Sequence, residues 1–138
     1  AYGKALILRE GSEITVAATG RMVKKADEIC AEFEKDGISC ELIAVPTIKP
    51  LDIAAILKSA EKTHRMITIE DNVKIGGMGS MIASAVSESG TECSFRIFAF
   101  PDKIIPQGSV AELDETYGLG NGEIIDYVKN TVRCSSDK

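Results

Sequence analysis

Short runs of β-branched and aliphatic residues alternate along this chain with longer amphipathic segments, and this alternation most constrains the fold. The runs lie at residues 5–9, 14–18, 38–45, 65–70 and 94–100. Between the second and third runs, apolar residues such as Met22, Ala26 and Phe33 recur at helical spacing. Strands that alternate with helices form βαβ crossovers. We therefore predict a three-layer α/β/α fold around a five-stranded, mostly parallel sheet.

The first two predicted strands stand too close together for a crossover. Only residues 10–13 separate them, whereas a parallel connection needs about a dozen residues or more. Strand 5–9 must therefore run antiparallel to strand 14–18 or lie elsewhere at an edge of the sheet. The 138 residues suit one domain, and no repeat or linker is visible, so we expect a single domain over residues 1–138.

Turn and capping residues mark the expected ends of the helices. Gly37 follows the first helix, Asp52 can cap the second, and Ser109 with Glu112 forms a capping box. Asn121 can cap the last helix. The other expectations are a loop over 71–79, a small-residue helix from 81 to 89, two short final helices, and a frayed tail over 134–138.

The balance of charge excludes several kinds of partner. The formal net charge is −5 and no basic stripe is present, which argues against nucleic acid or an anionic membrane. No apolar run approaches the roughly 18 residues of a membrane helix. The four cysteines form no C-x-x-C pair. We expect reduced thiols in a cytoplasmic protein, with Cys30 and Cys40 as small core residues.

A glycine-rich run is the most conspicuous candidate site. Gly76, Gly77, Gly79 and Ser80 precede a helix, where free amides can hold an anion. The spacing does not fit G-x-G-x-x-G, and no P-loop lysine precedes Ser80. Glycines also let a helix start press against a neighbouring backbone. We therefore treat these four residues as an interface or anion-binding loop.

For the other candidates we favour structural interpretations over functional ones. Glu70 and Asp71 can form paired carboxylates that hold a divalent cation, or can cap the next helix. Arg21 can clamp a phosphate or lie in solvent, and His64 fits a surface position at a helix end. No nucleophile elbow, zinc-peptidase motif or thiamine-diphosphate signature occurs. We predict no catalytic, cofactor-binding or metal-binding residue in this chain.

Four segments, in order, resemble the C-terminal domain of the thiamine-diphosphate-dependent transketolase family. They are Ile14–Gly20 with Met22-Val23, then Thr47–Asp52, then Thr68–Asn72 with Gly76–Ser80, and finally Pro101–Ser109 with Glu112-Leu113 and Tyr117–Leu119. Each segment is weak evidence alone, but together they span nearly the whole chain.

The resemblance implies a role in assembly. In that family, thiamine diphosphate and its Mg²⁺ lie between two other domains, and the activating glutamate also comes from elsewhere. The resemblance therefore implies that this domain binds no cofactor, is inactive alone, and joins thiamine-binding domains in cis or as a separate subunit of a homodimer. The abrupt start at Ala1 likewise suggests a fragment or subunit.

The branch of the family is less sharply marked. The Pro101–Ser109 tail looks more like 1-deoxy-D-xylulose-5-phosphate synthase, which joins pyruvate to glyceraldehyde 3-phosphate, whereas Thr47–Asp52 looks more like transketolase. We favour the synthase, with transketolase as the alternative. A binding module without catalysis, and a small metal enzyme using Glu70 and Asp71, are further hypotheses. We place an exposed apolar patch at 78–82, on Met78, Met81 and Ile82.

Overall fold

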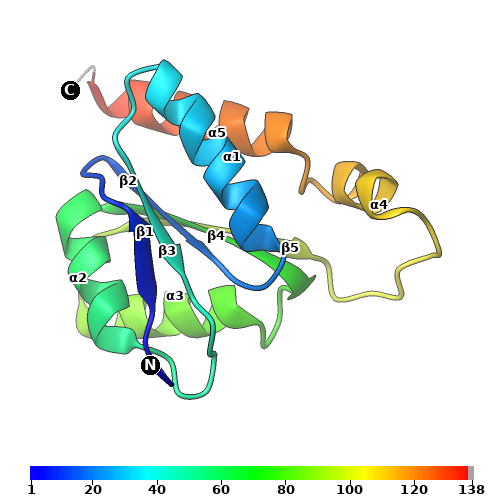
Figure 1. The fold of residues 1–138 in the computed structure, drawn as a ribbon, viewed down its shortest axis with the longest axis horizontal. Helices are drawn as coiled ribbons and strands as arrows, with labels where there is room; N and C mark the ends of the chain where they lie inside the picture. Colours follow the sequence, from blue (N-terminus) through cyan, green and yellow to red (C-terminus); the bar gives the residue numbers. More distant parts are fainter. Residues whose placement is uncertain (137–138) are drawn as a thin grey trace.

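A five-stranded sheet with the order β1-β3-β2-β4-β5 forms the centre of the protein (Figure 1). The computed structural model describes the backbone of residues 1–136 and the side chains of residues 1–132. The strands are β1 (Leu6–Arg9), β2 (Ile14–Ala18), β3 (Cys40–Ala44), β4 (Arg65–Val73) and β5 (Ser94–Phe100). The helices are α1 (Met22–Lys35), α2 (Ile53–Thr63), α3 (Met78–Ser89), α4 (Val110–Thr116) and α5 (Asn121–Ser136).

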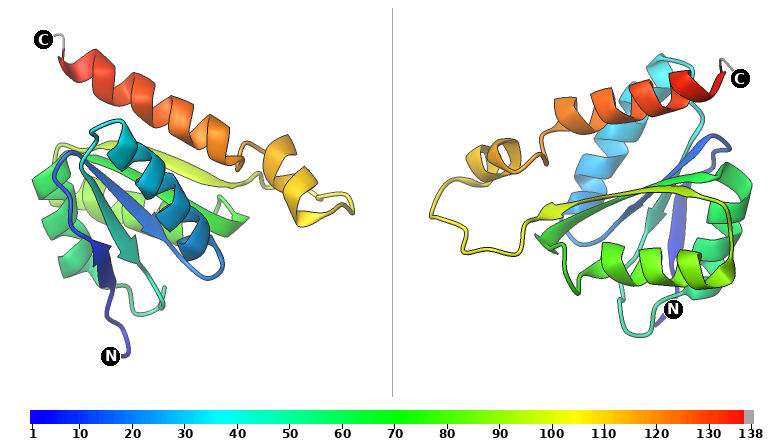
Figure 2. Two further views of the ribbon diagram at one scale, coloured as in Figure 1. Left: turned by 45° about the horizontal axis from the view of Figure 1, so that its top comes forward. Right: turned by 180° about the vertical axis from the view of Figure 1, so that it is seen from behind.

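Helices cover both faces of the sheet, which confirms the predicted three layers (Figure 2). One core cluster joins the sheet to α1 and α5 around Phe33, Leu42 and Val128. The other joins it to α2 and α3 around Ile43 and Ile82. No helix among residues 1–136 combines the length and apolar character needed to cross a membrane.

The first strand does not pair with the second strand but lies elsewhere, at an edge of the sheet, which was one of its two expected positions. β1 lies at the edge of the sheet and pairs antiparallel with β3, while β2, β3, β4 and β5 run parallel. Leu6 lies opposite Ala44 and Ile7 opposite Ile43, and the register then shifts before Arg9. Because Ala44 ends β3, β1 begins beside the carboxyl ends of the parallel strands.

Most predicted helix ends are confirmed. Gly37 has φ +76° after α1, the Asp52 side chain accepts a hydrogen bond from the Ala55 amide at 3.4 Å, and the capping box at Ser109 is complete. The final helix is longer than expected. It starts at Asn121 and runs for 16 residues, so the tail predicted to fray is helical as far as Ser136. The last two residues lie outside the described part.

The loop predicted over 71–79 is wrong at both ends. β4 continues to Val73, which pairs with Phe100, and the Lys74 amide donates to the Phe100 carbonyl at 2.8 Å. Polar residues in this segment suggested a loop, but pairing with β5 extends the strand across an irregular register. α3 begins at Met78, earlier than predicted, because a side chain from β4 caps its first turn.

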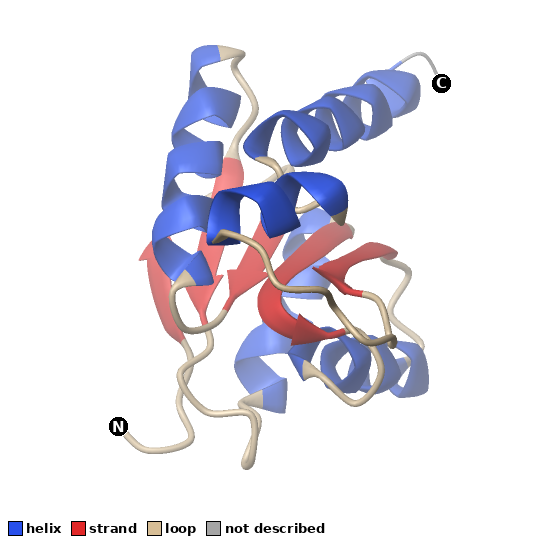
Figure 3. Ribbon diagram, turned by 90° about the vertical axis from the view of Figure 1, so that its right-hand side faces the viewer, coloured by secondary structure: helices blue, strands red, loops and turns tan. Residues whose placement is uncertain are grey.

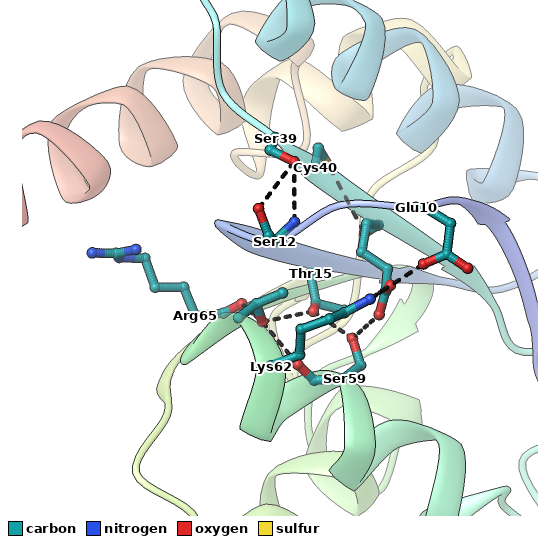
Figure 4. Close-up of polar contacts among 10 residues, drawn as sticks. Glu10, Ser12, Thr15, Ser39, Cys40, Ser59, Lys62 and Arg65 are labelled. Carbon is teal, nitrogen blue, oxygen red and sulfur yellow. Dashed lines mark hydrogen bonds and ion pairs between the residues drawn. The ribbon is translucent and has the colours of Figure 1, made fainter.

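A buried polar network fastens α2 to the sheet (Figure 4). Glu41 on β3 is 1% exposed and accepts hydrogen bonds from Ser59 and Lys62 of α2. Thr15 on β2 bonds to Ser59 at 2.6 Å and to Thr63 at 2.8 Å. Each buried polar side chain of this network therefore has a partner, which fixes the position of α2 along the strands more specifically than apolar packing alone.

Candidate functional site

The chain reverses its direction of winding between β2 and β4. It passes from β2 to β3 on one side and then crosses to β4 on the other. In open α/β sheets, ligands gather at this switch point, beyond the carboxyl ends of the strands. Figure 3 views the molecule from the side of α4. A cleft of about 290 Å³ lies at the switch point and is lined by Thr19, Gly20, Arg21, Ile48, Glu70, Asp71 and Asn72.

Arg21 lies in this cleft but is already paired. Its guanidinium contacts Asp71 at 2.5 Å and Asp114 of α4 at 3.5 Å. Asp114 also pairs with Lys25 at 2.9 Å and is only 6% exposed. The hydrogen bond to Asp71 raises the pKa of Arg21 and lowers the pKa of Asp71. The cleft therefore offers no uncompensated cation, and this cluster instead ties α4 to α1.

Replacing Asp71 with asparagine should make the protein less sensitive to acid. The lowered pKa of Asp71 means that its stabilising effect is present above its ordinary value of 3.8 and is lost as the pH falls further. The side chains of Arg21 and Asp71 are each about 40% exposed. We therefore expect Asp71→Asn to lower the free energy of unfolding by less than about 1 kcal/mol at pH 7. Urea unfolding at pH 7 and pH 2.5 should show the difference from wild type shrinking at the lower pH.

The glycine-rich loop holds a carboxyl group from its own chain. Glu70 is fully buried within β4, and its two side-chain oxygens accept hydrogen bonds from the amides of Met78 at 2.7 Å and Gly79 at 2.9 Å. These are the amides at the start of α3 that an anion would use. A second anion would have to displace a buried side chain. Glu70 therefore acts as a helix cap, and it does not face Asp71 as a paired carboxylate.

Close packing accounts for the glycines themselves. A Cβ atom at Gly79 would lie 2.5 Å from Thr68 Oγ1 and 2.8 Å from Ile97 Cγ2. A Cβ atom at Gly77 would lie 2.6 Å from the Val73 carbonyl oxygen. Gly76 has φ +74°. Ser80 donates its hydroxyl to the Lys74 carbonyl oxygen. That the loop also forms an interface stays a prediction.

The remaining sequence candidates have structural roles or were placed wrongly. His64 ends α2 in the left-handed region, with φ +54°, and its Nδ1 lies 3.1 Å from the Glu92 carbonyl oxygen. The apolar patch predicted at Met78, Met81 and Ile82 is wrong, because Met78 and Ile82 are fully buried on the inner face of α3 and Met81 is half-buried. Asp114 was missed, since a lone aspartate in a short amphipathic helix gives no signal of burial.

The exposed apolar side chains gather elsewhere, in two groups. The edge-strand patch consists of Tyr2, Leu6, Ile7, Leu8 and Ile53, which are 48–81% exposed. The carboxyl-edge patch consists of Ile75, Ile104 and Val110, which are 56–95% exposed. It follows β4 and β5, beside an apolar hollow of about 240 Å³ that includes Ile105 and Leu113.

The sequence and the fold of this chain both match those of known proteins. The sequence model of the family described as "Transketolase, C-terminal domain" matches residues 3–124. The chain belongs to this family. Transketolase C-terminal domains are also its structural neighbours: a structure titled "Split gene transketolase, inactive beta4 tetramer" superposes with a TM-score of 0.84 at 28% identity, over 95% of this chain and 43% of that chain.

Curated relatives of this transketolase C-terminal domain include two kinds of protein. The 1-deoxy-D-xylulose-5-phosphate synthase of Heliobacterium modesticaldum is 38% identical over 117 residues, which are 85% of this chain and 18% of that protein. A subunit of the apulose-4-phosphate transketolase of Phocaeicola vulgatus is 34% identical over 117 residues, or 85% of this chain and 37% of that polypeptide. The chain therefore spans well under half the length of these relatives.

Proposed function

We propose that this chain is the assembly domain of a thiamine-diphosphate-dependent two-carbon transferase. Membership of the transketolase C-terminal domain family supports this proposal, as does the small share of each relative that the chain covers. The proposed enzyme is a cytoplasmic homodimer that carries thiamine diphosphate and Mg²⁺ between its other domains. The isolated chain is inactive.

The edge-strand patch is the observation that carries the proposal. Leu6, Ile7 and Leu8 are consecutive, and each is 48–50% exposed. Because successive side chains of a strand point to opposite faces, both faces of β1 are apolar. That pattern is typical of a strand covered on both sides, yet β1 lies at an open edge. We assign this surface to contact with a thiamine-binding domain of the same enzyme.

Two reactions remain candidates, and different observations favour them. The tail at 101–109 and the Heliobacterium relative favour synthesis of 1-deoxy-D-xylulose 5-phosphate from pyruvate and glyceraldehyde 3-phosphate. The Phocaeicola relative and the split-gene structure favour a transketolase divided into two polypeptides. We propose the synthase as the primary function and the split transketolase as the alternative.

Domain exchange tests both the role and the branch. The chain should replace the C-terminal domain of the Heliobacterium synthase and support product formation there, while the chain alone turns over no substrate. A parallel exchange into the Phocaeicola relative, assayed together with the polypeptide that completes its enzyme, tests the alternative. Activity only in the second exchange would assign the chain to the transketolase branch. Turnover by the isolated chain would contradict the assembly role.

A matched pair of variants tests the proposed contact surface in the active exchange. Leu6→Asp with Leu8→Asp places two carboxylates on the edge-strand patch and should cost at least about tenfold in activity, with loss of dimer. Asn130→Asp adds a carboxylate on an exposed part of α5, remote from the patch, and should change neither. Circular dichroism of the isolated domain separates a lost interface from a lost fold. Full activity in the double variant would refute the assignment.

A further inference from the structure

Two buried cysteines meet between α1 and β3. Cys30 lies on the inner face of α1 and Cys40 begins β3, and neither is more than 1% exposed. Their Sγ atoms are 2.8 Å apart. That is closer than the roughly 3.5–4.0 Å at which even carbon atoms rest against one another. Cys93 lies apart, with its Sγ 3.6 Å from the Ser94 carbonyl oxygen.

The local fold holds the two thiols in this position. Asp36 and Gly37 turn the chain directly after α1, and the amides of Asp36 and Ile38 both bond to the Phe33 carbonyl oxygen at 3.0 Å. α1 is therefore joined to β3 by a short, hydrogen-bonded connection. Phe33 is fully buried and anchors the same end of the helix. The backbones that carry Cys30 and Cys40 are thus held next to each other by a hydrogen-bonded turn and by buried packing.

The separation suits a covalent bond better than a shared metal ion. Two thiolates on one zinc ion, each at about 2.3 Å in tetrahedral geometry, lie roughly 3.8 Å apart. A disulfide brings sulfur atoms to about 2.05 Å, so Cys30 and Cys40 need approach by less than about 1 Å. We propose that Cys30 and Cys40 are an oxidation site at which a small hydroperoxide converts two thiols into a disulfide.

The burial of the pair defines the oxidant. Glutathione disulfide is too large to reach sulfur atoms that are at most 1% exposed, whereas hydrogen peroxide is close to water in size. One thiol reacts with peroxide to give a sulfenic acid and water, and the second thiol displaces hydroxide from that sulfur, so that a second water leaves. Peroxide accepts two electrons in total. The hydrogen bond to Cys30 and the burial raise the pKa of Cys40, so the reaction is slow.

Mass spectrometry of the purified protein tests this site. The peroxide-treated protein should weigh two hydrogen masses less than the untreated protein. After unfolding and alkylation, it should carry two alkyl groups fewer. Tryptic digestion should then link peptide 26–35 to peptide 36–58, while peptide 75–96, which holds Cys93, stays alkylated. Closing this 11-residue loop should raise the ratio of folded to unfolded protein about a hundredfold.

Two serine variants complete the test. Cys30→Ser should abolish both the link and the stabilisation by peroxide, and Cys93→Ser should preserve both. If Cys30→Ser does not fold, the peptide map of the unaltered protein still decides. Full alkylation of Cys30 and Cys40 after peroxide, addition of oxygen atoms without a link, or a link through Cys93 would each overturn the proposal.

Discussion

Replacing Glu70 with alanine should destabilise this domain by about 4 kcal/mol, a large share of the stability of a protein of this size. The side chain is fully buried and accepts the amides of Met78 and Gly79. Its removal leaves two buried donors without partners, at about 1–3 kcal/mol each, and opens a cavity beneath α3. Urea unfolding followed by circular dichroism measures the change.

Two further variants show whether the cap itself is responsible. Glu92→Ala removes an exposed glutamate and should change the unfolding free energy by less than about 0.5 kcal/mol. Glu70→Gln keeps the shape and one acceptor oxygen, but turns an amide donor toward the second backbone N–H. The free energy of unfolding of Glu70→Gln should fall between those of wild type and Glu70→Ala. A Glu70→Ala protein as stable as wild type would show that water replaces the cap without cost.

Adding a single methyl group at Gly79 should cost about 3 kcal/mol. Its Cβ would lie 2.5 Å from Thr68 Oγ1 and 2.8 Å from Ile97 Cγ2, both on strands beneath the helix. Neither strand can move away without disturbing the sheet. The energetic cost of overpacking by Gly79→Ala should therefore lie at the upper end of its usual range. We expect a melting temperature lower by about ten degrees or more, measured by calorimetry.

Gly122 provides the matched control for this prediction. It is the second residue of α5, as Gly79 is of α3, but a Cβ atom there would meet nothing within 4 Å. Gly122→Ala should therefore leave the stability unchanged or raise it by up to about 1 kcal/mol, through the lower backbone entropy of alanine in a helix. Equal effects at the two positions would show that helix propensity, and not contact with β4 and β5, governs both.

The layers of the fold were predictable because each element carries its own periodicity. The helical spacing of Met22, Ala26 and Phe33, and the four-residue gap before Ile14, indicated three layers and an exceptional first strand. The pairing of β1 with β3 was not predictable, because a short edge strand satisfies the same pattern beside either neighbour. Only the packing of distant segments decides that choice.

The candidate site was located more easily than it was understood. The sequence identified Glu70 and the glycines as candidates, and helix capping was one interpretation of Glu70. It could not show that Glu70 folds back onto the amides of Met78 and Gly79, since this depends on how far β4 extends. The ion pairs of Asp114 join residues that are 89 and 93 positions apart in sequence, and no local pattern reports a contact of that range.

The antiparallel direction of β1 also fixes where the domain can be tethered. Since Leu6 lies opposite Ala44, the chain enters the sheet at the rim formed by the carboxyl ends of the parallel strands, where the switch-point cleft opens. The Tyr2 hydroxyl donates a hydrogen bond there to the Lys49 carbonyl oxygen at 3.3 Å. Any polypeptide joined ahead of Ala1 is therefore held at high effective concentration over that rim. A parallel first strand would have carried the same attachment to the opposite end of the sheet, a full strand length away.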